Sequence, residues 1–166
     1  MKKILIMLVA AALLLCGCGP QETFETVLDA LDTGEIESAK QVTFELPKEA
    51  AVTTMESTDG AVLYLCDGYN LFVQTLAGGD LNRTIKQVTG YPKDQLTVMQ
   101  TQMGQNRKYS CVGTAAGEGG DQVGRAVILD DGSYHYCVSV MADAQVSGKL
   151  MPVWQELMSS VSVSTD

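Results

Sequence analysis

The sequence predicts an α+β domain: an antiparallel meander sheet of about six to seven strands, with a short inserted helix and a C-terminal helix packed on it. Two observations support this fold class. From residue 41 onward, short runs of β-branched and aromatic residues alternate with glycine-containing turns. Apolar residues at helical spacing occur in only two stretches of that region. A length of 166 residues suits one modest domain.

The first strands are expected at Gln41–Leu46, which alternates and stops at Pro47, and at Ala61–Cys66 and Tyr69–Leu76. Proline lacks the N–H that a strand ladder needs. The last two runs are joined by Asp67-Gly68, a dipeptide favoured in type I′ hairpins because both positions tolerate positive φ. These two strands should therefore form an antiparallel pair.

A short helix is expected next. Asp80 has the character of an N-cap, and Leu81, Ile85 and Val88 follow at helical spacing. Gly90 then supplies a stop signal.

Further strands alternate with turn residues after this helix. Glycine, asparagine and aspartate dominate their connectors, which is typical of tight turns. The expected strands are Thr97–Met103, Arg107–Thr114, Val123–Leu129 and Ser133–Met141. A meander is the economical order for them.

The C-terminal region has the clearest helical pattern. Its apolar stripe consists of Val146, Leu150, Val153, Trp154, Leu157, Met158 and Val161. Pro152 fits poorly inside a helix, so the regular part is expected to begin near residues 149–152. Trp154 is interpreted as a core residue, because a large aromatic at this spacing usually packs inward. Residues 162–164 can add a terminal strand.

The N-terminus has the layout of a secretory signal peptide. Met1-Lys2-Lys3 is positively charged, and Ile4–Leu15 is an unbroken apolar run. About 12 helical residues span roughly 18 Å, which is less than the ~30 Å hydrocarbon core of a bilayer. The run is therefore interpreted as a targeting segment and not as a lasting membrane span.

The residues that follow resemble a bacterial lipobox, the site at which lipoprotein signal peptides are cut. The match is Leu15-Cys16-Gly17-Cys18, with Cys16 where Ala, Ser or Thr is more usual. The resemblance implies that Cys18 receives a thioether-linked diacylglycerol and becomes the first mature residue. An alternative box that ends at Cys16 fits less well, because a bulky Leu would precede the cysteine. An ordinary signal peptide, with Cys18 unmodified, is the other alternative.

The chain is accordingly divided into three parts: a signal peptide at residues 1–17, a lipidated cysteine with an acidic tether at 18–40, and a single α+β domain at 41–166. The tether is expected to contain one short element around Phe24–Leu31. Two or more acyl chains bind a membrane stably, at ~0.8 kcal/mol per buried CH₂. Diacylglycerol on Cys18 is thus expected to hold the protein on the extracytoplasmic face of the cell membrane.

The charge balance argues against nucleic-acid partners. The chain has 11 basic and 20 acidic side chains, for a net charge of −9. Neutralising phosphates needs clustered Lys and Arg. We therefore expect no DNA or RNA partner.

Three further cysteines, Cys66, Cys111 and Cys137, lie in apolar strand-like runs. They permit one disulfide and one thiol, or no disulfide. Buried free thiols that behave as small hydrophobes are the favoured interpretation. A redox or zinc site has little support, because no CxxC spacing occurs.

His135 is the only histidine, and strand alternation places it on one face with Cys137 and Ser139. Side chains two apart on a strand are separated by ~6.5–7 Å, which is too far for an engaged Cys/His dyad. His135 is therefore expected to be a half-exposed sheet residue without a catalytic role.

Carboxylates on glycine-rich turns are weak candidates for a Ca²⁺ site. They are Glu118, Asp121, Asp130 and Asp131. Their order differs from an EF-hand loop, and they are too few to complete a coordination shell. No metal and no cofactor is therefore expected.

The order of elements over about residues 42–163 loosely resembles the PsbP-like fold of small accessory proteins, including the strand Tyr134-His135-Tyr136 and the Trp154 helix. The resemblance implies a non-catalytic binding or accessory role. We expect the partner to be a protein or an envelope component near the membrane. One alternative is a small cell-envelope hydrolase that uses carboxylates, with or without a bound cation. Another is the binding of a small ligand between sheet and helix.

Overall fold

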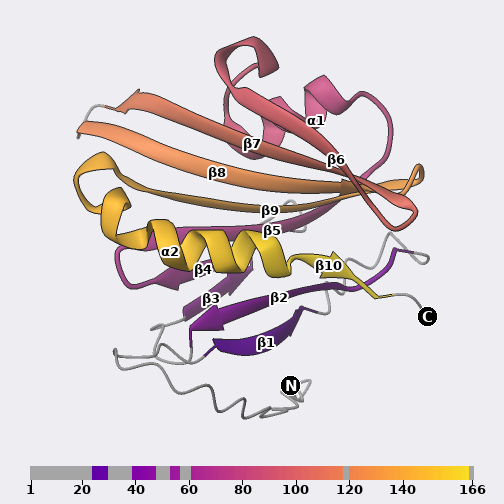
Figure 1. Ribbon diagram of the computed structural model, residues 1–166, viewed down its shortest axis with the longest axis horizontal. Coiled ribbons are helices and arrows are strands. Elements are labelled where there is room, and N and C mark those ends of the chain that lie inside the picture. The colour runs from indigo at the N-terminus through magenta and orange to yellow at the C-terminus, as the bar shows by residue number, and fades with distance from the viewer. Residues whose placement is uncertain (1–23, 30–38, 48–52, 57–60, 118–119, 165–166) are drawn as a thin grey trace.

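The computed structural model describes residues 24–29, 39–47, 53–56, 61–117 and 120–164. These residues form two sheets and two α-helices (Figure 1). Every strand pair within them is antiparallel. The predicted α+β class is confirmed.

The larger sheet has seven strands in the order β3-β4-β5-β9-β8-β7-β6. Their bounds are β3 Thr53–Glu56, β4 Ala61–Cys66, β5 Tyr69–Ala77, β6 Thr97–Met103, β7 Asn106–Gly117, β8 Gly120–Asp130 and β9 Tyr134–Asp143. The order departs from a simple meander at one place, because β5 pairs with β9 and not with β6. The connection after β5 carries the chain to the far edge, and three hairpins return it to β5.

The hairpins show which local predictions were accurate. Cys66 pairs with Tyr69 across the two-residue Asp67-Gly68 turn, and Gly68 has the positive φ of 79° that this turn needs. In the hairpin of β7 and β8, both strands run further than expected, as far as the Gly117–Gly120 pair.

A second, three-stranded sheet has the order β1-β2-β10. It contains β1 Phe24–Asp29, β2 Val42–Pro47 and β10 Ser162–Val163. The strands at β2 and β10 were expected, although not as a separate sheet. The element expected around Phe24–Leu31 is the strand β1, which pairs with β2 along its whole length.

The first helix, α1, spans Leu81–Thr89 and has the predicted ends. The Asp80 carboxylate accepts a hydrogen bond from the Asn82 N–H at 2.9 Å. Gly90 ends the helix in the left-handed conformation, with φ 78°. A short 3₁₀ turn, η1, follows at Lys93–Gln95.

The second helix, α2, spans Ala144–Ser160, so the start expected near residues 149–152 was wrong. The Asp143 carboxylate caps the helix by accepting from the Gln145 N–H at 2.8 Å. Pro152 lies inside the helix. Its missing N–H would have met the carbonyl of Gly148, and both residues are exposed, so water can bind the freed carbonyl.

The two helices cover opposite faces of the larger sheet (Figure 1). We call these the α1 face and the α2 face. The main core lies on the α2 face, between the sheet, α2 and β2. Trp154 is fully buried there and packs edge to face on Tyr69, with ring centroids 6.0 Å apart. The prediction that Trp154 is a core residue is confirmed.

Candidate binding site

Side-chain size changes along the strands of the α1 face. Under α1, Ile85 packs with Tyr109 of β7 and Ile128 of β8. Further along the same two strands, every residue that faces this side is glycine or alanine, apart from Cys111 and the exposed Gln122. The small residues are Gly113, Ala115, Gly124 and Ala126. The helix therefore covers the part with large side chains and leaves the part with small ones uncovered.

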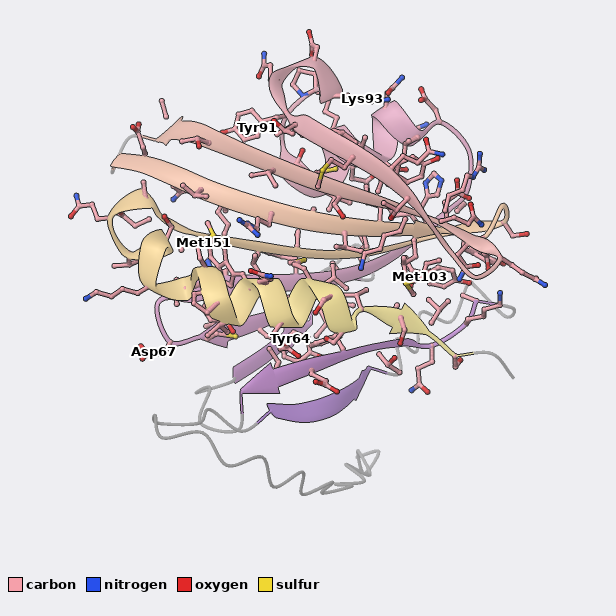
Figure 2. The ribbon with its side chains drawn as sticks, viewed as in Figure 1. Tyr64, Asp67, Tyr91, Lys93, Met103 and Met151 are labelled. Carbon is pink, nitrogen blue, oxygen red and sulfur yellow. The ribbon has the colours of Figure 1, made fainter. Side chains whose placement is uncertain are left out.

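A pocket of about 340 Å³ opens over these small residues. Its volume falls in the range of ~300–1,000 Å³ that is usual for ligand sites. Phe72 of β5 and Met141 of β9 line it from the sheet, and Tyr91 and Leu96 line it from the segment after α1. In Figure 2, Tyr91 lies on the α1 side of the sheet, whereas Tyr64 and Met151 lie on the opposite side.

The segment after α1 is fixed over β7 by local contacts. The Thr89 hydroxyl donates to the Ile85 carbonyl at 2.7 Å and accepts from the Tyr91 N–H at 3.2 Å. Leu96 rests directly on Gly113, where a Cβ would overlap its Cδ2 atom. A larger residue at position 113 would therefore displace the end of the Leu96 side chain, which forms part of the pocket wall.

The polar groups of the pocket are neutral. Ser139 is 8% exposed, and it lines the pocket from β9. Gln74 and Gln122 also contribute to the lining. Arg125 is part of the lining, but alternation along β8 turns its side chain to the α2 face, where its neighbour Val127 belongs to the main core.

Cys111 and Cys137 line the same pocket and are free thiols, as is Cys66 in β4. Burial raises the pKa of Cys111 to about 11, against a smaller opposing effect of the Lys93 charge. Burial also raises the pKa of Cys137, and the neighbouring Cys111 adds to this effect. Thiols that stay protonated at neutral pH are poor nucleophiles and poor metal ligands. The expectation of buried free thiols is confirmed for Cys111 and Cys137.

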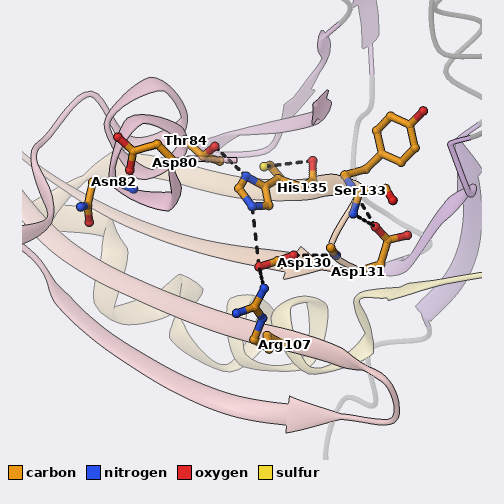
Figure 3. A network of polar contacts seen from close by, with 11 residues as sticks. Asp80, Asn82, Thr84, Arg107, Asp130, Asp131, Ser133 and His135 are labelled. Carbon is orange, nitrogen blue, oxygen red and sulfur yellow. Dashed lines mark hydrogen bonds and ion pairs between the residues drawn. The ribbon is translucent and has the colours of Figure 1, made fainter. Parts of the chain in front are cut away.

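His135 belongs to a polar network beside the pocket, under α1 (Figure 3). Its Nδ1 atom forms a hydrogen bond of 2.7 Å with the Thr84 hydroxyl, and its Nε2 atom lies 3.7 Å from the Asp130 carboxylate. Arg107 completes the network with an ion pair of 2.9 Å to Asp130. A hydroxyl, an imidazole and a carboxylate are the components of a nucleophilic triad.

This network is closed to substrates. His135 is 1% exposed and Thr84 is 5% exposed, so no reactant can approach the hydroxyl. The expectation that His135 is half-exposed was therefore wrong, because α1 covers this end of β9. The network ties α1 to β8 and β9 through hydrogen bonds that satisfy buried polar groups.

Of the four carboxylates considered for a cation, the three within the described residues do not form a metal-binding group. Asp121 is exposed near the start of β8, and Asp130 is the last residue of the same strand. Asp130 is already paired with Arg107. Glu118 lies outside the described residues. No group of three His, Cys, Asp or Glu in the described part of the chain is arranged to hold a metal ion.

Asp131 has a different role, because it binds the residue Lys40, just before β2, to the larger sheet. Its carboxylate accepts from the Tyr136 hydroxyl at 3.0 Å and pairs with the Lys40 ammonium at 3.2 Å. The Lys40 N–H also donates to the Tyr136 hydroxyl. Burial raises the pKa of Asp131, but these donors and the N–H groups of Tyr134 and Ser133 together hold it below the ordinary value.

The lipidation candidate Cys18 and the rest of the lipobox lie outside the described residues.

The pocket was not predicted from the sequence. Glycine and alanine at alternate positions of two expected strands were a signal for it. Among the described residues, no helix combines the length and hydrophobicity needed to cross a bilayer.

No protein-family model matches the chain, and the search of curated proteins finds no match. Solved structures do match. The chain is similar to cyanobacterial PsbP (CyanoP) from Synechocystis sp. PCC 6803, with a TM-score of 0.57, 13% identity, and coverage of 92% of this chain and 99% of that one. It is also similar to LpqN of Mycobacterium tuberculosis, with a TM-score of 0.54, 8% identity, and coverage of 86% and 92%.

A third match is a protein of Bacteroides thetaiotaomicron VPI-5482, with a TM-score of 0.49 and 14% identity over 75% of this chain. The chain spans 46% of the length of that structure. The similarity to CyanoP and LpqN supports the expected resemblance to the PsbP-like fold. At such low identities it establishes a shared fold, and function must be argued from the site.

Proposed function

We propose that this chain is a lipoprotein held by Cys18 at the extracytoplasmic face of the cell membrane, and that its folded part is a binding or accessory module. The observation that carries the proposal is the pocket of about 340 Å³ on the α1 face, with its small apolar floor and neutral polar groups. A concave, mainly apolar site of this kind is the usual form of a small-ligand site.

The anchoring part of the proposal is supported by the lipobox Leu15-Cys16-Gly17-Cys18. It is further supported by LpqN, which shares the fold and is described as involved in cell envelope biogenesis. Diacylglycerol on Cys18 would bind the membrane without a basic surface, which suits a chain with a net charge of −9.

Binding is favoured over catalysis by the state of the reactive groups. The Thr84 hydroxyl is buried, and burial raises the pKa of the Cys111 thiol. The Asp130 and Asp131 carboxylates are occupied by cationic side chains of the protein itself. A hydrolase needs an accessible nucleophile or a pair of free carboxylates.

The anchor is tested by comparing Cys18→Ala with the matched control Cys16→Ala. The first substitution should abolish incorporation of labelled palmitate and leave an unprocessed precursor that still carries Met1. The second should leave both lipidation and cleavage intact, because alanine is common at that position of a lipobox. Normal processing of Cys18→Ala, measured by mass spectrometry, would contradict the proposed anchor.

The accessory role is tested by chemical cross-linking in intact cells, followed by mass spectrometry. The wild-type protein should capture a reproducible partner that the Cys18→Ala variant does not capture. Equal capture by both proteins would contradict a role that depends on the anchor.

A further inference from the structure

We infer that the pocket on the α1 face binds an uncharged small molecule with a flat apolar body and one hydrogen-bonding group that meets the Ser139 hydroxyl. This inference deepens the proposed function and rests on the view that the folded part is a binding module. It is supported by the shape of the pocket, by one hydroxyl in its lining and by the placement of charge.

The floor of the pocket is flat because the central strands carry almost no side chain there. One cross-strand row runs Ser139, Ala126, Cys111, and the next runs Met141, Gly124, Gly113. The side chains of Phe72 and Tyr91 stand at the margins of this floor. A flat floor with aromatic margins suits a planar or ring-containing ligand, because aromatic groups pack edge to face or offset.

The Ser139 hydroxyl is a polar group on the pocket floor that a ligand can contact. It lies in the first row between Phe72 and Ala126, is more than nine-tenths buried, and lines the pocket. It is not among the fully buried side-chain atoms that lack a partner in the described part of the chain. A hydroxyl in the pocket lining can donate to or accept from a ligand group, and such a bond replaces its bond to water.

The ligand is assigned as uncharged because, among the residues that the structure describes, no charged side chain is turned into the pocket. Arg125 is turned to the α2 face, and Lys93 lies at the exposed start of η1, outside the lining. Transfer of an unpaired charge onto an apolar floor is strongly unfavourable. A neutral ligand avoids this cost.

Benzophenone is a suitable probe, because it is neutral and apolar with one carbonyl acceptor for Ser139. On irradiation its carbonyl carbon forms a bond to a nearby carbon, and the hydrogen from that carbon moves to the carbonyl oxygen. Methionine is a favoured target, and Met141 lines the pocket. Met99 of β6 is 59% exposed and lies outside the lining, so it reports non-specific labelling.

The experiment irradiates the mature lipidated protein in its own membrane with increasing benzophenone and maps the adducts by peptide mass spectrometry. Adducts at Met141 and its neighbours should saturate, whereas adducts at Met99 should rise in proportion to the concentration. 4-Benzoylbenzoate, the same body with a carboxylate, should label Met141 at least tenfold less well. Uniform labelling of both methionines, or equal labelling by the anionic probe, would overturn the inference.

Substitutions locate the site. Ala115→Leu should fill the pocket and reduce Met141 labelling at least tenfold. The matched control is Thr114→Leu, which lies on the opposite, exposed face of the same strand. Ser139→Ala should raise the benzophenone concentration at half-maximal labelling about fivefold, which is the usual effect of one lost hydrogen bond. Ser110→Ala, on β7 and on the α2 face, should have no effect.

The outcomes separate the two proposals. Saturable labelling of Met141 on a chain that lacks lipid would retain the pocket and reject the anchor. An anchored chain with unsaturable labelling would reject the pocket alone. If Ala115→Leu fails to fold, as circular dichroism would show, Ser139→Ala and the anionic probe still decide the result.

Discussion

Replacement of Trp154 by alanine tests whether α2 is held by the core that the structure describes. The side chain is fully buried. An aromatic side chain buries ~150–250 Å², which at ~25 cal/mol per Å² corresponds to about 4–6 kcal/mol. The indole N–H is buried without a hydrogen-bond partner among the described residues, and its removal returns about 1 kcal/mol. The expected loss in the free energy of unfolding is therefore about 3–5 kcal/mol.

The assay is a urea titration of the purified chain followed by circular dichroism, since the substitution removes the only tryptophan. Trp154→Phe is the matched control. It keeps an aromatic ring against Tyr69 and lacks the unpartnered N–H, so it should lose only about 1–2 kcal/mol. A loss below about 1 kcal/mol for Trp154→Ala would refute the placement of this residue in the core.

Two further predictions concern the polar contacts. Thr84→Val leaves the buried Nδ1 of His135 without its partner and should lower the free energy of unfolding by about 1–3 kcal/mol in the same urea titration; unchanged stability would contradict the network. Asp131→Asn should cost about 1–3 kcal/mol at pH 7. Because the folded-state pKa of Asp131 is lowered, its contribution is present above the ordinary value of 3.8 and is lost as the pH falls through the folded-state pKa. The stability difference between wild type and variant should therefore shrink in acid, and a constant difference would refute the assignment.

Local signals predicted much of the fold. The Asp67-Gly68 hairpin depends on the backbone preferences of two turn residues, which do not require contacts with the rest of the fold. The structure contains this hairpin as expected. The caps of α1, Asp80 and Gly90, are equally local. The pairing of β5 with β9 is different, because it joins segments separated by the α1 connection and three strands. No periodicity in either strand specifies that partner.

Two errors have physical causes. The start of α2 was placed too late because Pro152 was treated as a barrier. In fact the helix continues past it, and the freed carbonyl of Gly148 lies on the exposed side. His135 was expected to be half-exposed because alternation along β9 does not reveal that α1 covers this strand. Its burial depends on α1, whose Thr84 provides the partner.

The candidate site could be predicted only in part. The alternation of Gly113 and Ala115 in one strand and of Gly124 and Ala126 in the next was visible in the sequence. Whether these residues form one floor depends on the register, in which Gly113 faces Gly124 across the ladder. The hairpin between β7 and β8, which contains this pair, extends beyond the predicted strands.

Native mass spectrometry of the lipidated protein, purified gently from its own membrane, tests the central claim of a binding module most directly. The proposal predicts an additional bound mass, released as an uncharged small molecule, on the wild-type protein and on Thr114→Leu. The same mass should be absent from Ala115→Leu, in which the pocket of about 340 Å³ is filled. An identical set of bound masses on all three proteins would contradict the assignment of this pocket as the binding site.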